Sequence, residues 1–66
     1  MNIQLNGAPR QFPHSITVQQ LLDLEQLTQR RVAVEVNGEI VIRSLHGSHA
    51  LAEGDVVEIV HALGGG

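Results

Sequence analysis

Residues 32–42, which read Val-Ala-Val-Glu-Val-Asn-Gly-Glu-Ile-Val-Ile, carry the clearest structural signal in the chain. Apolar side chains alternate over residues 32–36, the period-2 pattern of a half-buried strand. Asn37-Gly38 follows, and both residue types accept the positive φ angles that a two-residue hairpin turn requires. Residues 40–42 are β-branched and apolar, so they predict a returning strand with both faces covered. The stretch therefore predicts an antiparallel hairpin.

A second hairpin is predicted at the start of the chain. Apolar residues alternate at positions 1, 3 and 5, and Asn6-Gly7 then supplies another turn signal. The return strand is expected over residues 10–14, with Phe12 facing the core. Pro9 and Pro13 lack backbone N–H donors, so this strand should be short or lie at an edge of the sheet.

Between the hairpins, residues 15–27 change to a helical period. The spacing predicts a helix that begins at Val18 and ends between residues 24 and 28, with Asp23 and Glu25 toward solvent. Thr17 and Gln20 fit a capping box, in which each side chain bonds the other residue's backbone N–H. The apolar face is expected to comprise Val18, Leu21, Leu22, Leu24 and Leu27.

The rest of the chain completes a two-layer α+β domain. Residues 44–52 are polar and irregular, with a short helical turn expected, and Gly54-Asp55 marks a turn. Residues 56–61 predict a fifth strand. A mixed sheet of about five strands with one main helix packed across it is the β-grasp, or ubiquitin-like, fold. The expected division is a β-grasp domain over residues 1–61 and a flexible tail over residues 62–66.

Composition excludes several classes of function. The chain has 66 residues, a net charge of −3, four basic residues and no lysine, which argues against nucleic-acid binding. The absence of cysteine excludes disulfides, thiolate catalysis and thiolate metal sites within this sequence. No apolar run approaches the roughly 20 residues of a membrane span, and no signal peptide is apparent. A cytoplasmic, single-domain protein is expected.

The tail Ala62-Leu63-Gly64-Gly65-Gly66 is the candidate functional segment. Glycine has no side chain to bury, so the segment is not expected to fold against the domain, and when fully extended it would reach ~17 Å at about 3.3–3.6 Å per residue. Such a strip fits a narrow channel of another protein and would present the α-carboxylate of Gly66 there. A carboxylate is a poor electrophile and needs activation before it can react. The alternative is an inert, frayed terminus.

Several stretches together resemble the ThiS family, the sulfur carrier proteins of thiamine biosynthesis. The resemblance covers essentially the whole chain. It is carried by residues 17–22 (Thr-Val-Gln-Gln-Leu-Leu), residues 34–44 (Val-Glu-Val-Asn-Gly-Glu-Ile-Val-Ile-Arg-Ser), residues 51–60 (Leu-Ala-Glu-Gly-Asp-Val-Val-Glu-Ile-Val) and Gly65-Gly66. The family often has proline where this chain has Ile42. Isoleucine restores a backbone N–H, which predicts a fourth strand that runs one residue further.

The resemblance implies a non-enzymatic protein co-substrate. An E1-like activating enzyme would use ATP to adenylate Gly66, and a persulfide sulfur donor would convert the adenylate to a thiocarboxylate for thiazole synthase. Leu63, Gly64 and Gly65 would present the reactive end, and the apolar sheet face near the tail would be the docking surface. No cofactor or metal is expected on the chain, and neither membrane nor nucleic acid is an expected partner.

Three alternatives remain open at this level. A molybdopterin synthase small subunit would use the same chemistry in another pathway, although that family is typically longer. A ubiquitin-like tag would be attached to target lysines, and a plain interaction module would have an inert tail. Trimming Gly66 would leave the activity of such a module unchanged.

Other polar residues receive simpler interpretations. His46 and His49 are expected to be solvated loop residues rather than metal ligands, because zinc usually requires three or four ligands. His61 is expected to end a strand, with partner contact as the alternative. Arg30-Arg31 is attributed to favourable charge near a helix C-terminus. The seven acidic residues are interpreted as solvated surface, some of which meets a basic rim on a partner.

Overall fold

The structure is a computed structural model that describes residues 1–61. Its elements, in chain order, are β1 (Asn2–Leu5), β2 (Ala8–Gln11), α1 (Val18–Leu24), β3 (Val32–Val36), β4 (Glu39–Val41), the 3₁₀ helix η1 (Arg43–Leu45) and β5 (Val56–His61). The five strands form one sheet in the order β2-β1-β5-β3-β4. Strands β1 and β5 run parallel, and the other neighbours run antiparallel. The predicted mixed sheet and β-grasp order are confirmed.

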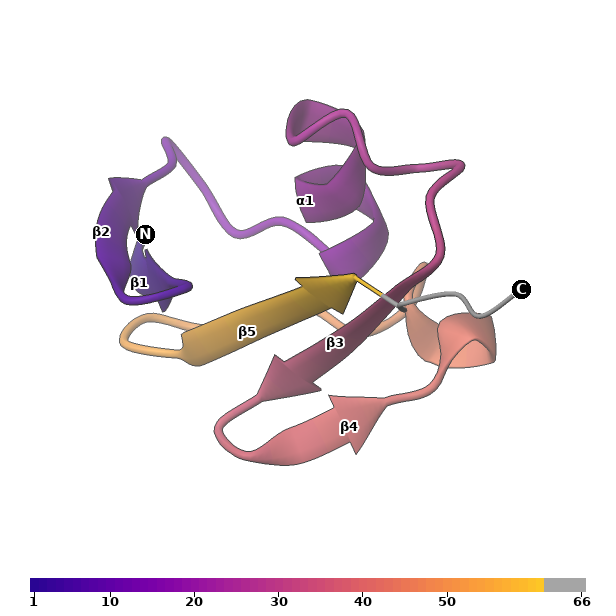
Figure 1. The fold of residues 1–66 in the computed structure, drawn as a ribbon. Helices are drawn as coiled ribbons and strands as arrows, with labels where there is room; N and C mark the ends of the chain where they lie inside the picture. Colours follow the sequence, from indigo (N-terminus) through magenta and orange to yellow (C-terminus); the bar gives the residue numbers. More distant parts are fainter. Residues whose placement is uncertain (62–66) are drawn as a thin grey trace.

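Helix α1 lies across one face of this sheet (Figure 1). The aliphatic core fills the space between the two layers. Its largest fully buried side chains are Leu21 and Val18 from the helix, Val34 and Val57 from the sheet, and Leu51 from the loop before β5. Burial of such side chains is the main stabilising contribution in a chain with so little aromatic surface. One face of the sheet is therefore closed, and the other faces outward.

Both predicted hairpin turns are present. Asn6 and Gly7 have φ angles of 50° and 82°, and Asn37 and Gly38 have φ angles of 53° and 85°. Positive φ at both central residues is the type I′ geometry, whose twist matches that of the flanking strands. The turns therefore fix the register of β1 with β2 and of β3 with β4.

The N-terminus of α1 is confirmed in detail. The Thr17 hydroxyl oxygen accepts from the Gln20 backbone N–H at 3.1 Å, and the Gln20 side-chain oxygen accepts from the Thr17 N–H at 2.8 Å. The helix ends at Leu24, and Gln26 adopts a φ of 61°. The expectation that Leu24 extends the apolar face is wrong, because its side chain is 58% exposed. Leu27 does pack against the core.

The position of β2 differs from the prediction by about two residues. The two-residue turn pairs Leu5 with Ala8 directly, so the strand covers Ala8–Gln11 rather than residues 10–14. Strand β2 is an edge strand, as predicted, and it accommodates Pro9. Phe12 is buried just beyond the strand, and its backbone N–H donates to the Met1 carbonyl at 2.8 Å.

The fourth strand is also corrected. β4 ends at Val41, and Ile42 stands at the N-cap of η1, so isoleucine at this position does not lengthen the strand. Only Val41 is buried, whereas Ile40 and Ile42 are 61% and 57% exposed. The prediction that both faces are covered is wrong because β4 is an edge strand with the helix on one side only. The short helical turn that follows is confirmed as η1.

Candidate functional site

Strand β5 leads to the predicted functional segment. Leu63, Gly64, Gly65 and Gly66 themselves lie outside the described residues. β5 occupies the centre of the sheet, between parallel β1 and antiparallel β3. A central strand is paired along both edges, which makes it a rigid base for whatever follows it.

The two turn asparagines also hold β5 in place. The Asn37 side-chain oxygen accepts from the Val56 N–H at 2.9 Å, and its amide nitrogen donates to Asp55 at 3.0 Å. The Asn6 side-chain oxygen accepts from the Ile59 N–H at 2.7 Å. Each asparagine thus serves both its own hairpin turn and the backbone of the central strand. The sequence predicted the first role and not the second.

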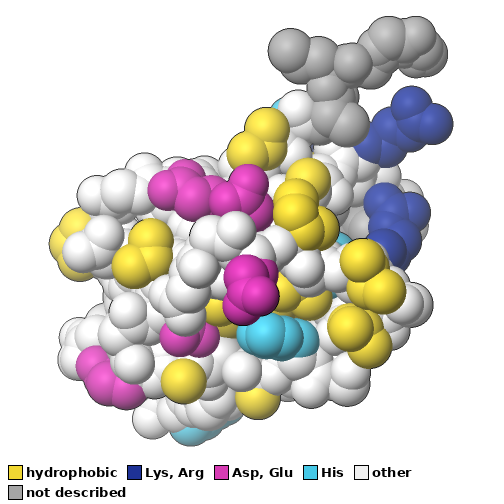
Figure 2. Space-filling model, turned by 90° about the horizontal axis from the view of Figure 1, so that it is seen from below, with side chains coloured by type: hydrophobic (Ala, Val, Ile, Leu, Met, Phe, Trp, Pro, Cys, Tyr) yellow, Lys and Arg dark blue, Asp and Glu magenta, His cyan; other side chains and the backbone are white. Residues whose placement is uncertain are grey.

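The outer sheet face carries exposed apolar side chains. We call the outer patch the exposed apolar residues of this face together with those just beyond β4, which are between 40% and 61% exposed: Val56, Val60 and Ile40 in the sheet, and Ile42 and Leu45 at η1. Figure 2 views the molecule from this side and shows apolar side chains interspersed with acidic ones. Clusters of exposed apolar surface on a small domain commonly mark interaction sites.

The β4–η1 part of this patch was missed from the sequence. An apolar β-branched run was interpreted as buried on both sides, because periodicity alone does not distinguish a central strand from an edge strand. The useful signal was the position of the run, directly after a tight turn and before a polar loop. An edge strand in a two-layer domain has one uncovered face.

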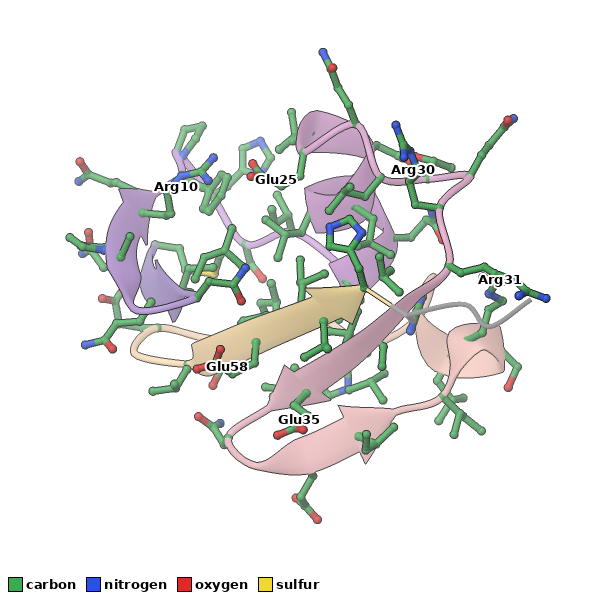
Figure 3. All side chains as sticks on the ribbon, viewed as in Figure 1. Arg10, Glu25, Arg30, Arg31, Glu35 and Glu58 are labelled. Atoms are coloured by element: carbon green, nitrogen blue, oxygen red, sulfur yellow. The ribbon has the colours of Figure 1, made fainter. Side chains whose placement is uncertain are left out.

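Two carboxylates lie within the same outer face. Glu35 and Glu58 are directly opposite partners in the β3–β5 ladder, and both side chains project from the outer side of the sheet (Figure 3). Like charges directly opposite each other are destabilising. Among residues 1–61, the single salt bridge joins Arg10 and Glu25, so neither of these carboxylates has a basic partner within that part of the chain.

The Arg10–Glu25 ion pair connects edge strand β2 to the end of α1 at 2.7 Å. The hydrogen bond from Arg10 lowers the pKa of the Glu25 carboxyl from its usual range. Arg10 also lies over the Phe12 ring, 5.6 Å from its centroid. Asp23 is solvent-facing as predicted, whereas the same expectation for Glu25 is wrong, because its side chain is only 25% exposed and is paired with Arg10.

Arg30 and Arg31 do not follow the predicted helix-dipole arrangement. The helix ends six residues before Arg30, and its last turn contains no basic residue. Both arginines instead lie on the loop that leads into β3, where Arg31 extends outward (Figure 3). Their attribution to the helix C-terminus is therefore wrong.

The three histidines considered from the sequence differ in burial: His46 is buried, His49 is partly buried and His61 is exposed. His46 is only 4% exposed, and its Nε2 bonds the Val41 carbonyl at 2.9 Å, so the expectation of a solvated loop residue is wrong. No cluster of metal-ligating side chains occurs within residues 1–61. His61 ends β5 and is exposed, as predicted, and its contact with a partner stays a prediction.

Comparison with known proteins identifies the family. The ThiS family model matches residues 3–66. The chain belongs to the ThiS family. Sulfur carrier protein ThiS from Bacillus subtilis is 40% identical over 65 residues, which cover 97% of this chain and 98% of that protein. The crystal structure of the thiamine biosynthesis protein ThiS from Geobacter metallireducens has a TM-score of 0.86, with 35% identity and full coverage of both chains.

A second kind of ThiS relative is much longer. A thiazole synthase from Paramagnetospirillum magneticum is 44% identical over all 66 residues, yet the chain spans only 20% of that protein's length. Another thiazole synthase, from Magnetococcus marinus, shows the same coverage at 39% identity. The family assignment agrees with the predicted resemblance to the sulfur carrier proteins of thiamine biosynthesis. Within residues 1–61, no helix has the length and apolar character needed to span a membrane.

Proposed function

We propose that Gly66 is the reactive residue of this sulfur carrier, with Leu63, Gly64 and Gly65 as the segment that presents it. The observation that carries the proposal is the ThiS family match, which continues through residue 66 and so includes the glycines. The central, doubly paired position of β5 supports it, because a rigid strand aims the segment that follows. The protein is expected to act in the cytoplasm.

The proposed chemistry has three steps. The Gly66 carboxylate attacks ATP on an E1-like activating enzyme, which releases pyrophosphate and leaves an acyl-adenylate. The terminal sulfur of a persulfide donor attacks the acyl carbon, and AMP leaves, which gives an acyl disulfide. A thiol then cleaves the sulfur–sulfur bond, forms a disulfide with the donor and releases the Gly66 thiocarboxylate. Every thiol in this scheme comes from a partner, because the chain has no cysteine.

Thiazole synthase is the proposed acceptor of the sulfur. Two proteins named thiazole synthase contain a stretch similar to this whole chain within one longer polypeptide. Fusion of a carrier to its acceptor keeps the local concentration of the carrier high. This observation favours the thiazole pathway over molybdopterin synthesis.

The mass of the intact protein tests the chemistry. We expect a fraction of the protein purified from cells to be heavier by the difference between one sulfur and one oxygen atom, with fragmentation placing the change at Gly66. Removal of Gly66 should abolish that species and the rescue of a thiazole-requiring strain. Protein ladders formed with lysate and ATP would instead favour a tag, and unchanged rescue without Gly66 would contradict the proposal.

The outer patch is the proposed docking surface for the activating enzyme. Val60→Asp places a charge on the patch beside the end of β5, where Val60 is 55% exposed and so not needed for the core. We expect adenylation kcat/KM to fall at least fivefold, since loss of a central apolar contact commonly costs ~1 kcal/mol or more. Leu24→Asp is the matched control, because Leu24 is similarly exposed on the helix layer. Equal effects of the two variants would contradict docking at this face.

A further inference from the structure

A small cavity of about 140 Å³ lies between α1, the loop before β3 and the start of η1. Its lining includes the guanidinium-bearing Arg30 and Arg43, the hydroxyl-bearing Thr28, and His46. The volume is well above the ~10–15 Å³ that one water molecule requires. Val32, another lining residue, pairs with His61, so the cavity lies beside the end of β5.

His46 places an unused ring nitrogen at this cavity. Its Nε2 bonds the Val41 carbonyl, and a carbonyl only accepts, so Nε2 carries a proton and donates. Nδ1 has no hydrogen bond with any of residues 1–61. No side-chain nitrogen or oxygen in that part of the chain is sealed from solvent without a partner. His46 as a whole is only 4% exposed and is a lining residue of the cavity, so the cavity is where Nδ1 can meet solvent or a ligand.

The charges around the cavity favour an anion. Arg30 and Arg43 form no salt bridge with residues 1–61. The neighbouring acid is Asp23, and the side chains of Thr28 and Gln19 both donate hydrogen bonds to it. Asp23 does not line the cavity, so its negative charge repels a bound anion only from beyond the cavity wall. On a chain with net charge −3, the arginine side chains visible in Figure 2 gather at one side, apart from the acidic ones.

We propose that this cavity binds a phosphate group. Two guanidinium groups match the paired oxygens of a phosphate, and His46 Nδ1 can accept from a protonated phosphate oxygen or, when protonated, donate to an ionised one. The oxygens of a tetrahedral phosphate can bond both guanidinium groups and His46 Nδ1 at once, whereas a carboxylate has only two oxygens. The inference does not depend on the sulfur-carrier chemistry and stands or falls separately from it.

NMR titration of the full chain with sodium phosphate tests the site. We expect saturable shifts of the backbone amides of Gln19, Thr28 and Val32 and of the His46 ring, with sodium chloride at equal ionic strength producing none. Arg30→Ala and Arg43→Ala should each weaken binding about tenfold, since a hydrogen bond to a charged group contributes ~1.5–3 kcal/mol and 1.4 kcal/mol is tenfold. Arg31→Ala removes the same charge one residue away and should change affinity less than twofold.

The comparison of ligands identifies the source of the phosphate. Saturation at a lower concentration of AMP than of inorganic phosphate would assign a phosphate ester, and equal concentrations would assign free phosphate. Equal saturable shifts with sodium acetate would overturn the assignment in favour of a carboxylate. Equal losses of phosphate affinity in the Arg30 and Arg31 variants, or shifts that follow ionic strength alone, would contradict the proposal. Either result would mean that phosphate responds to diffuse positive charge and not to a defined site. Arg30→Gln, which keeps part of the aliphatic side chain and a polar end at an exposed position, guards against a folding defect in Arg30→Ala.

Discussion

The two faces of β5 carry similar residues that have different roles. Val57 is completely buried beneath α1 and Ile59 is 7% exposed, whereas Val56 and Val60 are 40% and 55% exposed on the outer side. The strand therefore carries apolar residues on both faces, but only the inner face is covered. Only the inner residues gain the full ~25 cal/mol per Å² of buried apolar surface.

This difference separates stability from interaction within one strand. Exposed valines contribute little to the core, yet they lie with Ile40 beside Glu35 and Glu58, two carboxylates that form no salt bridge within residues 1–61. An apolar surface with embedded acids suits a partner that has an apolar surface and a basic residue. Substitutions on the inner face should therefore change the free energy of unfolding, and substitutions on the outer face should change the interaction with a partner.

The largest expected effect is on the inner face. Val57→Ala should lower the free energy of unfolding by ~2 kcal/mol, because two buried methyl groups are lost and a cavity remains. Val60→Ala is the matched control, since it makes the same chemical change on the same strand and shares any loss of strand propensity. Chemical denaturation measures both. Equal losses in the two variants would break the distinction between the faces.

The next effect concerns the helix that closes the inner face. Thr17→Ala removes the hydroxyl that accepts from the Gln20 N–H and should cost ~1 kcal/mol, within the range of 0.5–2 for such caps. Thr17→Ser keeps the hydroxyl and should recover most of the loss. Thermal unfolding monitors stability, and adenylation kcat/KM at a temperature where both variants are folded should stay unchanged. A loss of kcat/KM in folded Thr17→Ala would place the helix in the docking surface.

A smaller, pH-dependent effect is expected from the Arg10–Glu25 pair at the edge of the inner layer. Hydrogen bonding from Arg10 lowers the folded-state pKa of Glu25, so the unfolded chain binds more protons under acidic conditions. The stabilisation is present above the unfolded-state pKa, near 4.3, and is lost as pH falls through the folded-state pKa.

Denaturation of the wild type and of Glu25→Gln across pH 2–7 measures this contribution. We expect the wild type to be more stable by ~0.2–1 kcal/mol at neutral pH, the range for partly exposed pairs, and the difference to vanish under strongly acidic conditions. Asp23 and Glu53 also have lowered pKa values. Their contributions to the pH dependence of stability are the same in the wild type and in Glu25→Gln, so they cancel in the difference. A difference that persists at the lowest pH would mean that packing, not charge, explains the effect.

The turns, the helix start and the family of this chain could be predicted from its sequence. The Asn-Gly pairs fix their turns through backbone φ alone, and Thr17 with Gln20 fixes the helix start through contacts three residues apart. Such short-range rules act before any tertiary contact forms. They predicted the element order, and the order with its resemblance predicted the fold.

The shift of β2 follows from the length of its turn, whereas other errors came from long-range packing. His46 is polar and lies in an irregular loop, and only the folded structure brings it to the Val41 carbonyl beneath α1. Leu24 has the spacing of a core residue, but the helix ends there and leaves it exposed. The Glu35–Glu58 juxtaposition depends on the register between β3 and β5, which no local pattern specifies.

The smallest expected effect on stability is at that pair of carboxylates. Glu35→Gln removes one of two directly opposed like charges and should stabilise the fold by a few tenths of a kcal/mol, with the gain shrinking as salt screens the repulsion. Glu39→Gln is the control, because Glu39 lies opposite Val36 rather than another acid. If the outer face meets a basic partner, Glu35→Gln should also lower adenylation kcat/KM most strongly at low salt. Stabilisation without loss of kcat/KM would indicate a repulsion that no partner relieves.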